Sequence, residues 1–255
     1  MEKKSTKKIS TKQLEKILAE HMLWRKKIGG SKADLSGTDL SGMDFSGADL
    51  YGSNLTGTDL SGVNLCDAQL ESVNLCGANL SGANLGNAKL YKANLSGANL
   101  SGARLVNTKL YHADLSGANL SGANLKYAIL SGANLSGALL ENANLHHADL
   151  SGAKLSGAGL ENADLSNARL SKTNFSDANL SGANCSYAIF FPANLRRTDL
   201  SGANLTHADM RNSDLTDANL SGATLDGLNL SGANLSGTDI FLAHMGDMNT
   251  IPAPG

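Results

Sequence analysis

Residues 113–125 read ADLSGANLSGANL, and this five-residue pattern continues with little change along most of the chain. From Leu35 to Ile240 an apolar residue occupies every fifth position, and 36 of these 42 positions hold leucine. Two places before them stands a residue that is usually small and is alanine in 30 of the 42 cases. The repeating unit is therefore Ala-(Asp/Asn)-Leu-Ser-Gly, and it predicts a solenoid rather than a globular core.

A period of five fits neither an α-helix nor an extended strand. It does fit a chain that turns a corner every five residues, with Ala and Leu pointing inward and the other three residues facing solvent. Leu-Ser-Gly-Ala then forms the turn, and its third residue is Gly, where a type II turn requires a positive φ. Four such corners close a coil of about 20 residues, and successive coils stack at the strand spacing of about 4.8 Å. We expect about ten coils and a rod on the order of 50 Å long.

These repeats resemble the pentapeptide-repeat family, whose motif places a small residue, then Asp or Asn, then Leu or Phe, and then two free positions. The resemblance covers residues 31–245. It implies an all-β fold, a right-handed quadrilateral parallel β-helix. It implies no common reaction, because the family is defined by its fold and has several unrelated roles. Some members form dimers end to end, so the resemblance allows either a monomer or an end-to-end homodimer through the C-terminal coil.

The segments that flank the repeats have different compositions. Residues 1–32 carry a net charge of +7, whereas the remainder carries −9. We predict a flexible basic arm over residues 1–9, with a nucleic-acid or membrane contact as the alternative. Residues 10–30 should form a helix that caps the first coil, because Ser10 and Gln13 make a capping box and Gly29 with Gly30 can stop the helix after Ile28. Residues 246–255 form a tail that either covers the last coil or meets another subunit.

The composition also limits the location and the chemistry of the protein. Cys66 and Cys76 are separated by half a coil, so a disulfide between them is not expected. The chain has no apolar stretch approaching the roughly 20 residues of a membrane span, and no secretory signal follows its lysine-rich start. We therefore expect a cytoplasmic protein that makes no membrane contact.

One side of the predicted rod differs from the other three. Glycine holds the third turn position at eight of eleven sites in the series 37, 57, 77 and at eight of ten in the series 42, 62, 82. It holds only two of ten in the series 47, 67, 87 and four of ten in the series 52, 72, 92. The side between these last two corners is formed by residues 66–72 and the corresponding segments every 20 residues up to 206–212, and we call it the decorated face.

This side of the rod collects the unusual side chains of the repeats. Counting Tyr51, which lies on the same side one coil before residue 71, it holds all five tyrosines, the four histidines of the repeats and seven of their eleven basic residues. Tyr91 and Tyr111 should stack one coil apart. The candidate binding residues are Lys89, Tyr91, Lys92, Lys109, Tyr111, His112, Lys126, Tyr127, Ile129, His146, His147, Arg169, Lys172, Tyr187, Ile189, Phe191, His207 and Arg211.

Two interpretations of this face remain open at this point. Exposed Tyr, Arg and apolar residues together favour recognition of a partner. Alternatively, the demand for positive φ differs between corners, and larger residues accumulate on one side without any function. Catalysis is not expected, because His146 and His147 lack a third ligand at metal spacing and no nucleophile–base set or phosphate loop is present. We expect no catalytic residue, no metal and no cofactor.

The leading functional prediction is a non-enzymatic structural or protein-interaction scaffold that presents the decorated face to a protein. The resemblance suggests an alternative, a DNA mimic that binds DNA gyrase or topoisomerase as quinolone-resistance proteins do. The net charge of −9 in the repeats suits that role. Leucine in place of phenylalanine at the central position, the lack of a projecting loop and the dilution of acidic residues by Asn count against it. Direct nucleic-acid binding through the basic face is a third and unfavoured prediction.

Overall fold

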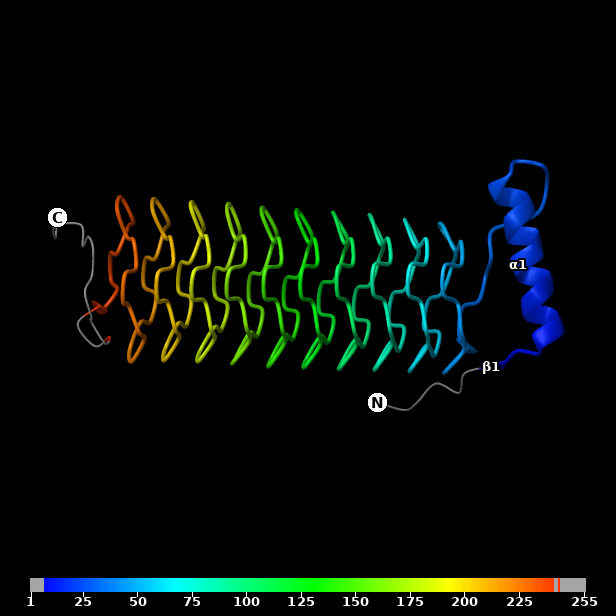
Figure 1. The fold of residues 1–255 in the computed structure, drawn as a ribbon, viewed down its shortest axis with the longest axis horizontal. Helices are drawn as coiled ribbons and strands as arrows, with labels where there is room; N and C mark the ends of the chain where they lie inside the picture. Colours follow the sequence, from blue (N-terminus) through cyan, green and yellow to red (C-terminus); the bar gives the residue numbers. More distant parts are fainter. Residues whose placement is uncertain (1–6, 241–242, 244–255) are drawn as a thin grey trace.

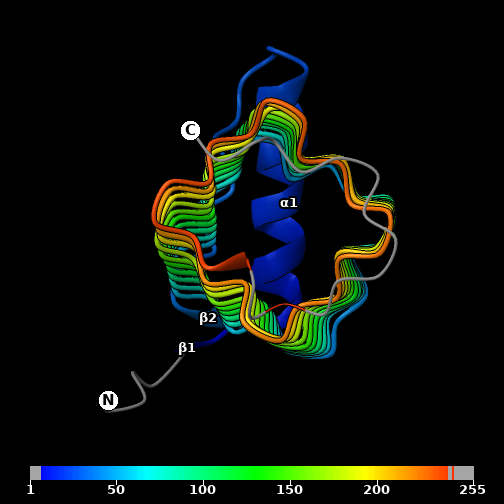
Figure 2. The same ribbon diagram turned by 90° about the vertical axis from the view of Figure 1, so that its left-hand side faces the viewer.

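The structure is a computed structural model and describes residues 7–240 and residue 243. It is a rod of stacked coils with one helix across its N-terminal end (Figure 1). The elements in chain order are strand β1 (Lys7–Lys8), helix α1 (Thr11–Arg25) and strand β2 (Thr38–Asp39). Parallel bridges then run from Asp34↔Asn54 to Asp214↔Asn234, and each joins residues 20 apart. One coil therefore takes 20 residues as predicted, and Figure 2 shows the coils superimposed along the rod.

The corners have the predicted turn. In a typical one, Gly47 has a φ of 64° and the N–H of Ala48 donates to the carbonyl of Phe45 at 3.0 Å. Within the described repeats, this bond from the fourth residue to the first recurs at every corner except the one that begins at Phe190. There Pro192 occupies the third position, where its ring prevents a positive φ. The N–H of Ala193 donates instead to Ser213 Oγ at 3.1 Å.

The interior consists of stacked leucine and alanine side chains. From Leu50 to Leu230, every residue at the leucine position is at most 2% exposed. Each buried leucine contributes on the order of 2 kcal/mol to folding. Some alanine positions hold threonine, and its hydroxyl is satisfied within the core: Thr108 Oγ1 donates to the carbonyl of Leu85 at 2.7 Å. The core therefore accepts small polar residues where a carbonyl lies within reach.

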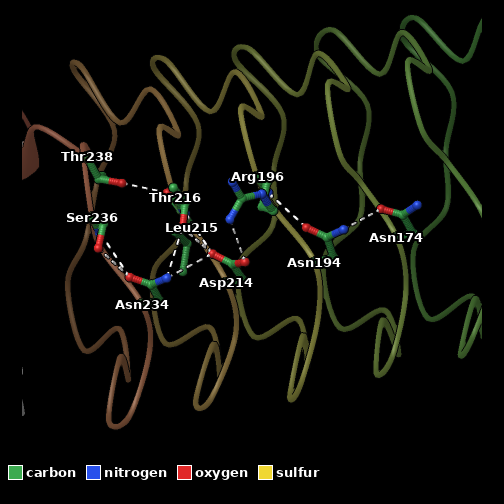
Figure 3. A network of polar contacts seen from close by, with 9 residues as sticks. All are labelled: Asn174, Asn194, Arg196, Asp214, Leu215, Thr216, Asn234, Ser236 and Thr238. Atoms are coloured by element: carbon green, nitrogen blue, oxygen red, sulfur yellow. Dashed lines mark hydrogen bonds and ion pairs between the residues drawn. The ribbon is translucent and has the colours of Figure 1, made fainter.

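Where a repeat has Asp or Asn before its leucine, these side chains form outer ladders that join the coils. In Figure 3, Asn194 Nδ2 donates to Asn174 Oδ1 at 2.9 Å. The Asp214 carboxylate accepts the N–H of Thr216 at 3.0 Å and the side chain of Asn234 at 3.4 Å. The same side chain thus closes its own turn and bonds to the neighbouring coil, which explains why Asp or Asn is the usual residue at this place.

Helix α1 begins as predicted and ends earlier than predicted. Ser10 and Gln13 form the capping box, with Ser10 Oγ accepting the N–H of Gln13 at 3.3 Å. The helix ends at Arg25 rather than Ile28, because Lys27 adopts a φ of 57° and the N–H of Ile28 donates back to Leu23 at 3.1 Å. This closure before Gly29 is a Schellman motif. No helix of the described chain has the length and apolarity needed to cross a membrane.

The predicted flexible arm is wrong for Lys7 and Lys8. These residues form β1, which pairs in parallel with β2 so that Lys7 lies opposite Thr38. The physical reason is that the first coil presents a free strand edge, which β1 covers. Residues 1–6 and the predicted tail 246–255 lie outside the described residues, so the choice between a covered last coil and an end-to-end dimer stays a prediction.

His21 fastens α1 to the first coil. Its side chain is fully buried, its Nδ1 accepts the N–H of Ala33 at 3.1 Å, and its ring stacks on Trp24 with centroids 5.5 Å apart. Burial lowers the pKa of His21. The folded state therefore favours the neutral ring.

We expect the attachment of α1 to weaken in mild acid. Because the folded pKa of His21 lies below the unfolded value of about 6.5, the stabilisation is complete above that pH and is lost as the pH falls from there towards the folded pKa. Trp24, the single tryptophan, reports on the contact. Its fluorescence should change below about pH 6.5 in the wild type. It should not change in His21→Asn, whose amide oxygen can accept the same N–H without titrating. An identical pH profile for both proteins would contradict this assignment.

Candidate interaction surface

The structure brings the predicted residues together on one side. Bridges align the central positions of successive coils, so that Lys109, Ile129, Asp149, Arg169 and Ile189 form one continuous ladder. None of the eighteen candidate residues is buried. Lys89, Tyr91, Lys109, Tyr111, Lys126, Ile129 and His146 are half-buried, and Lys92, His112, Tyr127, His147, Arg169, Lys172, Tyr187, Ile189, Phe191, His207 and Arg211 are exposed.

Aromatic rings stack along this face from one coil to the next. The predicted stack of Tyr91 on Tyr111 is confirmed, with centroids 5.4 Å apart. Tyr127 stacks on His147 at 5.4 Å with the rings 10° apart. Further along the rod the pair Tyr187 and His207 lies at 5.0 Å. These contacts order the rings before any partner arrives, which lowers the entropy lost on binding.

Apolar side chains are exposed mainly on the same side. Tyr127, Tyr187, Ile189 and Phe191 are 51%, 55%, 44% and 38% exposed. In the described repeats, the other exposed large hydrophobic residue is Leu139, which lies on the opposite side. Exposed apolar and aromatic groups gathered on one face are typical of an interface.

The backbone φ angles test the interpretation that the corners of the decorated face are relaxed. Tyr127 and His147 have φ values of 58° and 56°, and the same values occur at Asn142 and Asn162 on another side of the rod. These corners therefore impose the same positive φ. Among the described corners of the decorated face, only the one at Pro192 lacks it, so a generally relaxed demand on this face is not observed. An ordinary L-residue in this conformation costs roughly 1–2 kcal/mol, whereas Gly, Asn and Asp tolerate it.

Bulky residues accept this strain almost entirely on the decorated face. Its two corners hold seven of the eight positive-φ residues of the repeats that are not Gly, Asn, Asp or Ser. The eighth, Arg197, forms an ion pair with Asp177 at 2.6 Å. The seven are Lys92, His112, Tyr127, His147, Lys172, Tyr187 and His207.

The face is basic in its N-terminal half. Within the described structure, no carboxylate forms an ion pair with Lys89, Lys92, Lys109 or Lys126, while Lys89 Nζ donates to an amide oxygen at 2.8 Å. Near the C-terminal end the charge is compensated, because Arg211 forms an ion pair within its own coil. That pair joins Arg211 to Asp209 at 2.7 Å, and the guanidinium lies 5.0 Å from the ring centre of Phe191.

One chain of polar contacts on the face contains the residue types of a hydrolase triad but in a different order. His146 Nδ1 lies 2.8 Å from Ser166 Oγ, which in turn donates to Asp164 Oδ1 at 2.6 Å. Serine stands in the middle of this chain, whereas in a hydrolase triad the histidine stands between serine and acid. Burial raises the pKa of the Cys185 thiol to about 12, which leaves it protonated and unreactive. Among the described residues, no group of three or more side chains could hold a metal ion.

The decorated face also contains a sequence repeat, which is not visible when the candidate residues are considered one by one. Each coil presents one corner residue and one central residue two places later. These pairs recur after 60 residues, and five of the six positions are identical in the two copies. The candidate residues leave out four members of these pairs, namely Asn107, Asp149, Asn167 and Asp209. The recurrence after 60 residues is the sequence signal that identifies them. The pairs are Asn107/Lys109, Tyr127/Ile129 and His147/Asp149, followed by Asn167/Arg169, Tyr187/Ile189 and His207/Asp209.

Comparison with known proteins identifies the family. The model for pentapeptide repeats matches residues 31–67, 68–105, 118–157, 158–197, 193–230 and 203–240. The chain belongs to the pentapeptide-repeat family. Membership carries the all-β fold of a right-handed quadrilateral β-helix, as the sequence predicts.

Several solved structures of this family are similar to the chain. HetL, a pentapeptide-repeat protein involved in heterocyst differentiation regulation from the cyanobacterium Nostoc sp. strain PCC 7120, is 34% identical over 94% of this chain and 98% of its own, with a TM-score of 0.41. QnrB1, a plasmid-mediated fluoroquinolone resistance protein, is 23% identical over 80% of this chain and 92% of its own, with a TM-score of 0.47. Rfr23 from the cyanobacterium Cyanothece 51142 is 35% identical over 39% of this chain and 62% of its own, with a TM-score of 0.20. Among curated protein sequences, none matches this chain.

Proposed function

We propose that this pentapeptide-repeat protein is a non-enzymatic scaffold that presents the decorated face to a protein partner, in the cytoplasm. The observation that carries the proposal is the positive φ of bulky side chains such as Tyr127, His147 and Tyr187. Glycine at these corners would fold more easily, so the side chains are retained against a cost in stability. A selected function that uses them accounts for this retention.

The chemistry of the face supports a protein as the partner. Tyrosine and arginine are enriched among the residues that contribute most to the centres of protein interfaces, and the exposed isoleucine adds apolar area. The lysines of the N-terminal half, which form no ion pair among the described residues, make the face basic. A basic surface does not suit a mimic of DNA, so we do not propose gyrase binding through it.

Replacing Tyr127 and Tyr187 together by glycine separates stability from binding. We expect the double variant to be at least as stable as the wild type, because glycine relieves the strain at both corners. We expect it to lose partner binding by about 2 kcal/mol or more, as when hot-spot residues are removed. Thermal denaturation measures the first effect, and quantitative affinity capture from the source cells measures the second.

The matched control is Asn142→Gly with Asn162→Gly, which changes two corners of another side that have the same φ. This control should retain every captured protein. The proposed function is wrong if the Tyr127→Gly/Tyr187→Gly protein captures the same partners in the same amounts as the wild type.

A further inference from the structure

We propose that the partner on the decorated face is a second copy of this chain, packed side by side and antiparallel. The inference deepens the proposed function and rests on it. It starts from the central ladder, whose side chains alternate in a fixed order of charge. Lys109 is basic, Ile129 apolar and Asp149 acidic, and the same order returns at Arg169, Ile189 and Asp209.

This ladder is complementary to itself when one rod is reversed. If a twofold axis passes between the coils of Asp149 and Arg169, then Asp149 of each copy faces Arg169 of the other. Ile129 faces Ile189 one coil further out. Beyond these, Lys109 faces Asp209. Every contact occurs twice, as a twofold interface requires.

The two corner ladders agree with the same arrangement. A twofold axis that crosses the face brings each corner ladder against its own copy. No position then meets a residue of like charge, and several large residues meet a glycine. Along one corner the facing pairs are Asn107 with His207, Tyr127 with Tyr187, and His147 with Asn167; along the other they are Tyr111 with Arg211, Lys92 with Gly232, and Lys172 with Gly152.

The neighbouring registers are unfavourable. Sliding the two rods by one coil in one direction places Asp149 against Asp149 of the other copy. Sliding them by one coil in the other direction places Arg169 against Arg169. A parallel twofold arrangement would oppose each charge of the central ladder with itself. Like charges in contact across an interface cost several kcal/mol, so one antiparallel register is selected.

A second copy also fits better than a simple peptide segment. Both rods rise by about 4.8 Å per coil, so their side chains stay matched along the whole contact. A strand rises by about 6.7 Å for every two residues and a helix by 1.5 Å per residue, and neither keeps step with the coils. The overlap extends from Lys89 to Asn229 and would bury the exposed Tyr127, Tyr187 and Ile189.

The residues nearest the twofold axis, Asp149 and Arg169, offer the sharpest test. Arg169 is exposed and takes part in none of the ion pairs of the described residues. Asp209, in contrast, is already bound to Arg211. Sedimentation of the full chain over a range of concentrations should show a reversible dimer. Asp149→Arg and Arg169→Asp should each weaken it at least about tenfold, because each sets like charges together. The double variant exchanges the two charges and should restore the wild-type affinity.

Lys154→Asp is the control, since it makes a similar charge change on a neighbouring side and should leave the dimer unaffected. A wild-type chain that stays monomeric, or a charge-exchange variant that fails to dimerise, would overturn the inference.

If the wild type is monomeric but Tyr127→Gly/Tyr187→Gly loses a captured protein, the proposed function stands with a different partner. If the dimer forms and the tyrosine variant changes neither it nor the capture, the tyrosines are not part of the interface and both proposals fail.

Disulfide cross-linking checks the register independently. In a background with Cys66→Ser and Cys76→Ser, which leaves the buried Cys185, Ile129→Cys and Ile189→Cys are prepared as separate proteins. Mixing the two should give a disulfide-linked dimer on mild oxidation. Each alone should not, because identical positions lie three coils apart, about 14 Å, beyond the reach of a disulfide. Efficient cross-linking of Ile129→Cys with itself would exclude the proposed register.

Discussion

Replacing Phe190 with alanine is expected to lower the free energy of unfolding by about 3–5 kcal/mol. The side chain is fully buried, and its ring centroid lies 5.9 Å from that of Phe175. Hydrogen bonds to the following coil hold the backbone at Phe190, so the coil cannot collapse into the space left behind. Urea denaturation followed by circular dichroism measures the loss. A change below about 1 kcal/mol would show that Phe190 is not tightly packed.

The neighbouring Cys185 provides the control for this prediction. It occupies the preceding leucine position of the same coil, and it is smaller than the usual leucine where Phe190 is larger. Phe190→Leu should leave a cavity and Cys185→Leu should overfill the interior, while the two together restore the common residue at both places. We expect the double variant to be more stable than the sum of the single effects by about 1 kcal/mol or more. Simple additivity would contradict the shared packing.

Gly132→Ala is expected to have the second-largest effect on stability. Gly132 has a φ of 68°, and a Cβ placed there would lie 2.5 Å from Nδ1 of His112 in the preceding coil. The substitution therefore adds displacement of a ring to the backbone cost of roughly 1–2 kcal/mol. At Gly137 the φ is 64° and no atom lies within 4 Å, so Gly137→Ala measures the backbone cost alone.

The difference between these two variants isolates the contact with His112. Gly132→Ala should lose more stability than Gly137→Ala in the same denaturation experiment. Adding His112→Gly to Gly132→Ala should bring the loss down to the level of Gly137→Ala. Equal losses for the two single variants would mean that His112 moves aside freely and that this corner of the decorated face is not ordered.

Most of the fold could be predicted because its determinants lie within a few residues of one another. The five-residue period places Leu and Ala inside, and the Gly of each repeat supplies the positive φ of the turn. The errors concern features that depend on distant partners or rare conformations. Lys7 and Lys8 form a strand because a free edge lies some 30 residues further along the chain. Lys27 ends the helix in a conformation that lysine seldom adopts.

The candidate face was predictable to a similar degree. Sorting the sequence by coil places the tyrosines and histidines on one side, and the contact of Tyr91 with Tyr111 follows from that alone. The sequence could not decide whether the decorated corners had a relaxed backbone, because φ is not visible in residue types. The stack of Tyr127 on His147 was also not predicted. The two residues occupy the same turn position in successive coils, but they are of different types, so the sequence alone does not suggest the pair.

The central claim is that a partner covers the decorated face, and side-chain footprinting tests it most directly. Hydroxyl-radical labelling would compare the chain in an extract of its source cells with the purified chain at high dilution. We predict that Tyr127, Tyr187 and Phe191 become several-fold less reactive in the extract. Leu139, which is 45% exposed on the opposite side, should react equally in both samples. Unchanged reactivity of Tyr127 and Tyr187, with or without protection of Leu139, would contradict the account.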